Sequence, residues 1–244
     1  AYLAEEIGPS LAALGFTFTI HPNPEPPYGP LLVATRHEGG ALPTVLMYGH
    51  GDVVRGQDSS WTRGQGPWSL AAEGERLYGR GTADNKGPLL VHVAAVAKLL
   101  AAEPDLPLRI TFLIEGEEEI GSPSFNPFVY AHTELLAADV ALISDTHILG
   151  MDTPTIVYAL RGLAYLEVKV TGPDHDLHSG IYGGAVHNPV NALCAMIAKL
   201  QDEQGRILIP GFYDKVRDLE PEERAEMAKI PFDREVWLAE AGVI

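Results

Sequence analysis

Hydrophobic residues in the first part of the chain follow two kinds of spacing, one helical and one strand-like. Leu3, Ile7, Leu11 and Leu14 recur every three or four residues and predict a helix, and residues 87–100 predict a second one. Short apolar runs rich in β-branched residues alternate with these segments and predict strands at residues 16–20, 31–35, 44–48, 109–114 and 140–144. Helices between buried strands indicate an α/β fold, with a mostly parallel sheet flanked by helices.

The pattern changes near residue 155. Residues 156–160 and 164–170 alternate between apolar and polar side chains, which predicts two half-buried strands. A loop rich in Gly and His follows, and a helix is predicted to begin at Asn188-Pro189 and to run to about Leu200. We therefore predict two domains, over residues 1–155 and 156–244, with an α+β composition in the second.

Acidic residues dominate the charge of the chain. Among 244 residues, 33 are Asp or Glu and 17 are Lys or Arg, so the formal net charge is −16. Binding to nucleic acid or to an anionic membrane surface depends on clustered cations, so we expect neither partner. Cys194 is the single cysteine, which excludes an internal disulfide and any metal site built from several thiolates.

Acidic and imidazole side chains gather just after the predicted strands and before the second helix. Ligands of open α/β sheets bind beyond the carboxyl ends of the strands, so these groups are expected at one edge of the sheet. They come from four segments of the chain and include His50, Asp52, Asp84, Glu115, Glu117, Glu118, Glu119 and Asp145.

This cluster indicates a metal site, because several carboxylates at one edge repel one another unless cations compensate them. Oxygen and nitrogen ligands without thiolates suit zinc, manganese or cobalt. The set is large enough for two metal ions that share a bridging carboxylate. A dinucleotide site is not expected, since Asp84 stands where its fingerprint needs the third glycine, and no G-x-S-x-G motif marks a serine hydrolase.

Five short motifs occur in order along the chain. They are MYGHGDVV at residues 47–54, LYGRGTADNKG at 77–87, EGEEEIGS at 115–122, ISD at 143–145 and DLHSG at 176–180. The first four resemble the M20 family of di-zinc metallopeptidases, and the fifth resembles its branch of carnosinases and cytosolic nonspecific dipeptidases. The resemblance implies a zinc-peptidase-like catalytic domain over residues 1–155 and an inserted lid and dimerisation domain over residues 156–244.

The resemblance also implies two zinc ions, with manganese or cobalt as alternatives, and four ligands. These ligands would be His50, Asp84, Glu119 and Asp145. Asp84 would bridge the two ions, and Asp52 would orient the imidazole of His50 from behind. Glu118 would be the general base. Glu117 competes for that role, although its spacing to the glycine and serine of the motif favours Glu118.

The resemblance implies an enzyme that hydrolyses dipeptides or short peptides. It also implies a homodimer and a cytoplasmic location. His178 of the lid domain would stabilise the tetrahedral oxyanion in the active site of the partner subunit. An N-acyl amino-acid amidohydrolase or deacylase of the same family is the alternative, because it would share every ligand and differ only in its pocket.

One family ligand has no counterpart in this sequence. The family closes its metal site with a second histidine near the C-terminus, and no residue here can be assigned to it. The resemblance therefore implies a fragment of a longer enzyme that binds metal weakly and has little activity by itself, and a non-catalytic fragment is a further hypothesis. His147, close to Asp145, is a further candidate for lining the site, whereas His92 is expected to be packed within its helix.

Overall fold

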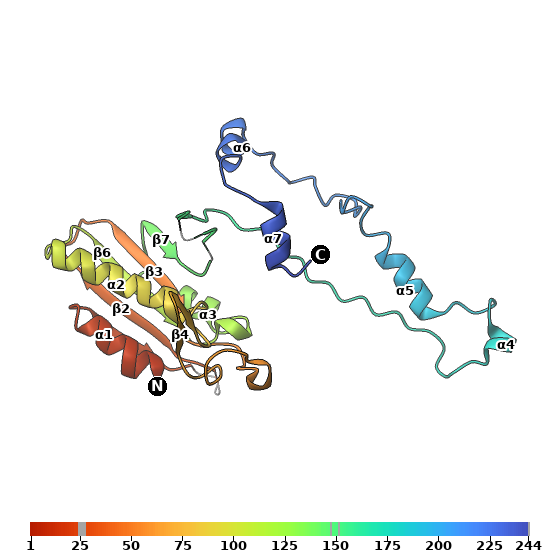
Figure 1. Ribbon diagram of the computed structural model, residues 1–244, viewed down its shortest axis with the longest axis horizontal. Helices are drawn as coiled ribbons and strands as arrows, with labels where there is room; N and C mark the ends of the chain where they lie inside the picture. Colours follow the sequence, from red (N-terminus) through yellow and green to blue (C-terminus); the bar gives the residue numbers. More distant parts are fainter. Residues whose placement is uncertain (24–27, 147, 151, 244) are drawn as a thin grey trace. The chain divides into compact units, whose positions relative to one another are not determined.

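The chain divides into two compact units, Ala1–Leu160 and Arg161–Ile244. The computed structural model describes residues 1–23, 28–146, 148–150 and 152–243, so His147 lies outside the described residues. Figure 1 shows both units, with colours that follow the sequence from red at the N-terminus to blue at the C-terminus. The assignment of a catalytic domain to residues 1–155 and of a lid domain to residues 156–244 stays a prediction.

A five-stranded sheet with the order β1-β2-β6-β3-β7 forms the centre of the first unit. Its strands are β1 (Thr17–His21), β2 (Leu31–His37), β3 (Thr44–His50), β6 (Arg109–Glu115) and β7 (Val140–Ile143), close to the five predicted runs. The strand β3 pairs in parallel with β6 and β7, whereas β2 pairs antiparallel with β1 and β6. The predicted α/β class is confirmed, and the sheet is mixed.

The register of the parallel strands determines where their loops begin. His50, the last residue of β3, lies opposite Glu115, the last residue of β6. On its other side, β3 pairs with β7 up to Tyr48 opposite Ile143. The segments that follow all three strands therefore leave from the same edge of the sheet.

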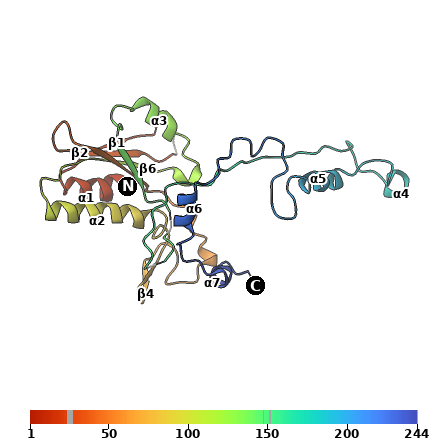
Figure 2. The same cartoon turned by 90° about the horizontal axis from the view of Figure 1, so that it is seen from above.

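Helices cover both faces of this sheet (Figures 1 and 2). On one face lie η1 (Leu3–Ile7), α1 (Gly8–Ala12) and α2 (Lys86–Ala102), and on the other lies α3 (Phe125–Ala131). Side chains of β2 alternate between the two layers, as the period of a strand requires. Leu32 and Ala34 pack in the cluster with η1, α1 and α2, whereas Leu31 and Val33 pack with residues of α3.

The first predicted helix forms in two parts. The residues of η1 make a π-helical turn that continues directly into α1. Leu3, Ile7 and Leu11 are buried against the sheet, as their spacing predicts. Gly15 has φ +85°, a left-handed conformation that favours glycine and ends the helical segment.

Two shorter features lie between β3 and α2. They are the 3-10 turn η2 (Asp58–Ser60) and a two-stranded antiparallel hairpin of β4 (Ala71–Glu73) and β5 (Arg76–Tyr78). A further 3-10 turn, η3 (Glu118–Ile120), follows β6 and precedes α3. Both connections leave from the edge of the sheet at which β3 and β6 end.

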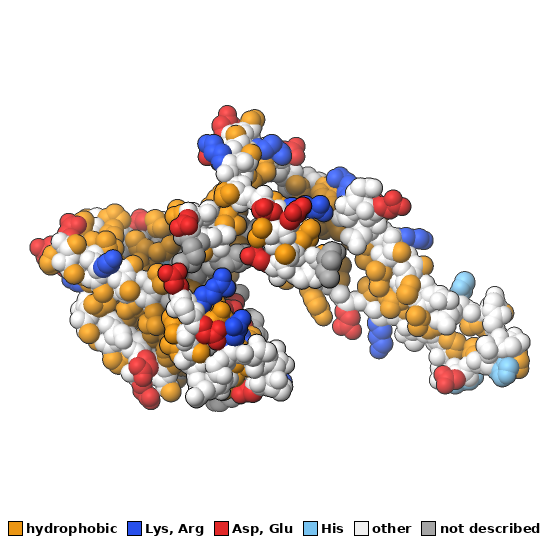
Figure 3. Space-filling view, viewed as in Figure 1, with side chains coloured by type: hydrophobic (Ala, Val, Ile, Leu, Met, Phe, Trp, Pro, Cys, Tyr) orange, Lys and Arg blue, Asp and Glu red, His pale blue; other side chains and the backbone are white. Residues whose placement is uncertain are grey.

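The described residues of the second unit, 161–243, form four short helices. They are α4 (Ser179–Tyr182), α5 (Pro189–Ile197), α6 (Pro221–Met227) and α7 (Arg234–Glu240). Asn188 begins α5 as predicted, because its side chain accepts a hydrogen bond of 2.8 Å from the backbone N–H of Val190. No described residue of this unit is buried. Val190 and Ile197 of α5 are exposed, and Figure 3 shows hydrophobic side chains on the surface of this unit.

The prediction of strands at residues 156–160 and 164–170 is wrong. Both segments lack strand structure and have no pairing partner among the described residues. Leu163 is 93% exposed and Tyr165 is 88% exposed. Alternating side chains are compatible with a strand, but the backbone N–H and C=O groups form a ladder only beside a neighbouring strand. Across the described residues, every helix is too short or too polar to cross a membrane.

We expect Phe112→Ala to lower the free energy of unfolding of the first unit by about 3–5 kcal/mol. Phe112 is 0% exposed and lies edge-on to Phe16, with 5.5 Å between the ring centroids. Its removal leaves a cavity between the sheet and its helices. Urea denaturation followed by circular dichroism measures the change. Leu90→Ala is the control, because Leu90 is 52% exposed on α2; an equal loss in both variants would contradict this account of the core.

Candidate metal centre

His50 lies at the centre of the predicted site. It is the last residue of β3, and its side chain is 0% exposed. Its Nε2 atom lies 2.9 Å from Asp84 Oδ1, 3.7 Å from Asp145 Oδ2 and 3.8 Å from Glu118 Oε2. The edge of the sheet therefore holds one buried imidazole that faces carboxylates from three other segments.

Two groups of candidate ligands share this imidazole. One contains His50, Asp84 and Glu119, and the other contains His50, Glu118 and Asp145. Within each group, one ligand atom from every residue lies within 4.8 Å of the others. The four residues predicted as ligands are thus brought together, with the predicted base among them. A set of imidazole nitrogen and carboxylate oxygen atoms fits zinc, manganese or cobalt.

The carboxylates shift the pKa of the groups around them. Burial lowers the pKa of His50, but the hydrogen bond to Asp52 and the charges of Asp145 and Asp52 outweigh it and raise the pKa to about 9. Burial raises the pKa of Glu118, and the charges of Asp145 and Glu119 add to this effect against the opposing charge of His50. The centre therefore holds an excess of negative charge, which a divalent cation would compensate.

Glu117, the competing candidate for the base, points away from this centre. It is 1% exposed, and its carboxylate accepts hydrogen bonds of 2.6 Å from the backbone N–H of Ser124 and 2.9 Å from Asn23 Nδ2. These bonds tie the loop after β6 to the start of α3. The arrangement favours Glu118 over Glu117 as the residue that faces His50.

Asn85 is a residue of the site that sequence reasoning missed. It is 1% exposed, its Nδ2 donates a hydrogen bond of 2.9 Å to Asp145 Oδ1, and its Oδ1 accepts one of 3.4 Å from the backbone N–H of His50. A Cβ atom on Gly49 would lie 3.1 Å from Asn85 Oδ1, so a glycine before His50 leaves room for this amide. The only signal for Asn85 in the sequence was its position directly after Asp84. In the structure, a cis peptide bond joins the two residues.

A second buried carboxylate lies beside the centre without facing it. Glu115 is 1% exposed, and Tyr48 donates a hydrogen bond of 2.6 Å to its Oε1. Burial raises the pKa of both groups, and their hydrogen bond raises that of Tyr48 further while it lowers that of Glu115. His92 is packed in α2 as expected, with its Nε2 within hydrogen-bonding distance of the Ser144 hydroxyl.

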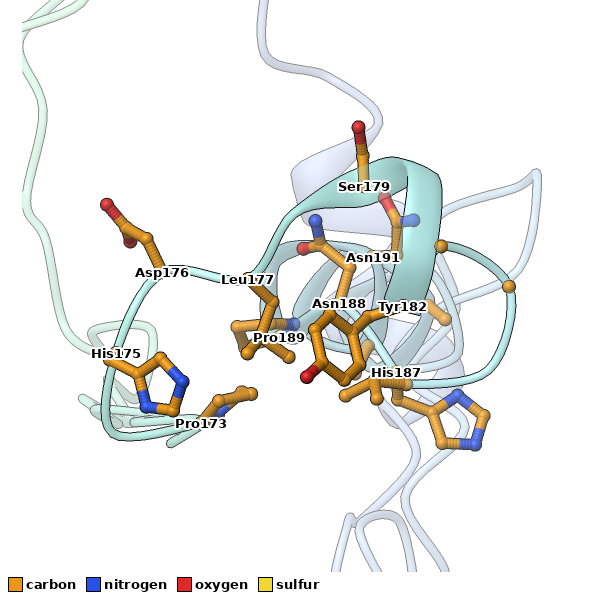
Figure 4. A pocket seen from close by; sticks show the side chains of 16 residues that line it. Pro173, His175, Asp176, Leu177, Ser179, Tyr182, His187, Asn188, Pro189 and Asn191 are labelled. Carbon is orange, nitrogen blue, oxygen red and sulfur yellow. The ribbon is translucent and has the colours of Figure 1, made fainter.

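His178 belongs to the second unit. It is exposed and precedes α4, and its Nδ1 accepts a hydrogen bond of 3.0 Å from the backbone N–H of Gly180. The residues around it line a cavity of about 820 Å³. Figure 4 shows Tyr182 beside Pro189 in this cavity, with His175 and His187 at its two ends in this view.

Comparisons with known proteins agree on a single family. Residues 46–239 match the family described as Peptidase family M20/M25/M40. The Beta-Ala-His dipeptidase of Mus musculus is 37% identical over 214 residues, which are 86% of this chain and 43% of the mouse protein. The Cys-Gly metallodipeptidase dug1 of Schizosaccharomyces pombe is 36% identical over 201 residues, which are 81% of this chain and 42% of the yeast protein.

The fold has a similar counterpart among solved structures. The M20 family metallo-carboxypeptidase Sso-CP2 from Sulfolobus solfataricus aligns with a TM-score of 0.76 and 30% sequence identity. The alignment covers 99% of this chain and 53% of that protein. The chain spans less than half the length of the mouse and yeast relatives, 43% and 42% respectively.

We expect Glu117→Ala to lower the free energy of unfolding by about 1–3 kcal/mol, because it removes the buried carboxylate that accepts hydrogen bonds from the backbone N–H of Ser124 and from Asn23 Nδ2. Glu118→Ala is the matched control, since it removes a carboxylate that other carboxylates repel, and we expect no loss of stability. Urea denaturation with a chelator present measures both values without a contribution from bound metal. Equal losses in the two variants would contradict the distinction drawn between these glutamates.

We expect Asn85→Ala to weaken the binding of zinc about 10-fold to 100-fold, because Asp145 loses the amide that orients its carboxylate. Isothermal titration of the metal-free chain with zinc measures the affinity. Asn126→Ala is the control, because Asn126 is an exposed residue of α3. An affinity unchanged by Asn85→Ala would show that Asp145 does not depend on this hydrogen bond.

Proposed function

The chain belongs to peptidase family M20/M25/M40, and on that premise we propose that the protein containing it uses two divalent cations to hydrolyse dipeptides. The observation on which the proposal depends is the convergence of four carboxylates around the buried imidazole of His50. Zinc is the proposed metal, with manganese or cobalt as alternatives for the same donor atoms. The relatives named as Beta-Ala-His and Cys-Gly dipeptidases support dipeptides as the substrates.

The residues that would hold the metal are His50, Asp84, Glu119 and Asp145, and Asp84 is the proposed shared ligand. Asp84 suits a shared role because its side chain is 63% exposed and its Oδ1 still lies 2.9 Å from His50 Nε2. Asn85 would hold Asp145 in place, and Asp52 would keep the imidazole of His50 oriented. When bound, the two cations would supply Lewis acidity toward the scissile carbonyl and the attacking water.

Glu118 is the proposed general base. It would accept a proton from the attacking water and return it to the leaving amine as the peptide bond breaks. Its raised pKa, caused by burial and by the neighbouring carboxylates, makes it a better proton acceptor than an ordinary surface glutamate. Its side chain is 37% exposed, so a substrate can approach it from solvent.

His178 is the proposed donor to the tetrahedral oxyanion, supplied by the second subunit of a homodimer. Its Nδ1 accepts a hydrogen bond from Gly180, so the proton of the neutral ring resides on Nε2. That N–H is free to donate to developing negative charge. We also propose a cytoplasmic location for the homodimer.

The alternative is an N-acyl amino-acid amidohydrolase, because such an enzyme would use the same metal ligands and the same base. A non-catalytic fragment is the weaker hypothesis, since the two relatives described above are both named as dipeptidases. The retention of His50, Asp84, Glu118, Glu119 and Asp145 together also supports a catalytic protein.

Substrate assays on the longest natural protein that contains this chain test the proposal. After loading with zinc, we expect hydrolysis of β-Ala-His or Cys-Gly, a loss of activity with a chelator and its recovery when zinc is added back. Metal analysis is expected to find two zinc ions per chain. Turnover of N-acetyl amino acids alone would support the amidohydrolase, and no turnover of either class would contradict the proposal.

Glu118→Gln is expected to reduce turnover by about 10²-fold to 10⁴-fold with the zinc content unchanged, because the amide cannot take the proton of the attacking water. Steady-state kinetics and metal analysis on the same sample measure both quantities. Glu75→Gln, at an exposed position of the β4–β5 hairpin, is the control. If Glu117→Gln had this effect instead, the assignment of the base would be shifted by one residue.

A further inference from the structure

The turn η3 holds two residues of the candidate centre, Glu118 and Glu119. The first backbone N–H groups of a helical turn have no acceptor within the turn, and the preceding residue commonly supplies one from its side chain. Here that residue is Glu117, and its side chain makes no such hydrogen bond. Its carboxylate is engaged by Ser124 and Asn23 instead.

Asp52, from the loop after β3, supplies the missing acceptors. Its Oδ1 accepts a hydrogen bond of 3.2 Å from the backbone N–H of Glu118, and its Oδ2 accepts one of 3.0 Å from that of Glu119. Each carboxylate oxygen thus serves one N–H group. For these two N–H groups, the described residues provide no second acceptor.

A further hydrogen bond joins the loop after β3 to the turn η3, with the donor now in the loop and the acceptor in the turn. The backbone N–H of Val54 donates a hydrogen bond of 3.2 Å to Glu119 Oε1. The arrangement resembles a capping box, in which two positions exchange side-chain and backbone hydrogen bonds, except that the returning N–H here belongs to Val54 and not to Asp52. In this chain it connects segments that are 66 residues apart in the sequence.

His50 has a second hydrogen-bond acceptor besides the Asp52 carboxylate, whereas the two N–H groups of the turn η3 do not. Its Nδ1 lies 3.3 Å from Asp52 Oδ1, but also 3.2 Å from the backbone oxygen of Asp52. A protonated Nδ1 therefore has a main-chain acceptor even without the carboxylate. For the two N–H groups of the turn, the Asp52 carboxylate is the sole acceptor among the described residues.

We propose that Asp52 is a positioning residue that caps the turn η3 and so holds Glu118 and Glu119 in place independently of its contact with His50. Because Asp52 lies two residues after His50, the cap fixes the turn relative to the imidazole. Only the statement that Glu118 acts as a base rests on the proposed function. The cap itself is a property of the metal-free chain.

Amide hydrogen exchange of the metal-free chain tests this role. In Asp52→Ala, the amides of Glu118 and Glu119 are expected to exchange about tenfold faster or more, since each loses a hydrogen bond to a charged acceptor. His50→Ala is the matched control: it removes the imidazole but leaves both carboxylate oxygens on the turn, so the two amides keep their protection. An equal acceleration in His50→Ala, or none in Asp52→Ala, overturns the proposal.

The amides of β6 serve as an internal reference for the fold. If the β6 amides also exchange faster in Asp52→Ala, the fold itself is weakened and a second variant is needed. Asp52→Asn serves this purpose, because it preserves the shape of the side chain and retains one acceptor oxygen. The proposal then requires Glu118 or Glu119 to lose protection while β6 keeps it. Full protection of both amides in Asp52→Asn overturns it.

Kinetics add a readout at the level of the reaction. With zinc at saturation, Asp52→Asn is expected to lower kcat about tenfold or more with little change in KM, because the base is displaced while the substrate contacts remain. Full recovery of kcat at saturating zinc would mean that Asp52 acts only through metal binding, which overturns the proposal. A wild-type protein without activity would contradict the proposed function and leave the exchange result intact.

Discussion

Four carboxylates share the space in front of the buried imidazole of His50, and their mutual repulsion is the constraint that the surrounding structure has to meet. The protonated imidazole compensates part of this charge, as its raised pKa indicates. Further compensation comes from N–H groups: Asn85 donates to Asp145, and the turn η3 donates to Asp52. A divalent cation would supply what these groups do not, which is why the cluster indicates a metal centre rather than an ordinary acidic surface.

The parallel pairing of β3 with β6 and β7 brings these charges together. Because His50 and Glu115 end their strands in register, the loops after them start side by side. The helices on the two faces of the sheet (Figure 2) bury side chains of β2, β3 and β6 between the layers. The role proposed for Asp52 follows from the same geometry, since a short side chain beside His50 can reach the turn after β6 only when the two strands are neighbours.

Most of the first unit could be predicted from the sequence, because buried strands and an apolar helix have distinct periods. The five strands and α2 lie close to their predicted positions, and the four candidate ligands lie in two groups that share His50. Strands at residues 156–160 and 164–170 could not be judged in this way, because a strand needs a neighbour and not only alternation. Asn85 and Glu117 were also missed or left open, because their partners lie far away in the sequence.

The sequence by itself determined which chemical groups gather at the edge of the sheet, because the ends of strands and the start of α2 can be recognised from hydrophobic periodicity. Only the tertiary structure decided in which directions the neighbouring glutamates point. Glu117 turns toward Asn23, 94 residues away in the sequence, whereas Glu118 turns toward His50. The direction of a side chain in a loop depends on the backbone conformation and on distant hydrogen-bond partners, and neither is present in the local pattern of residues.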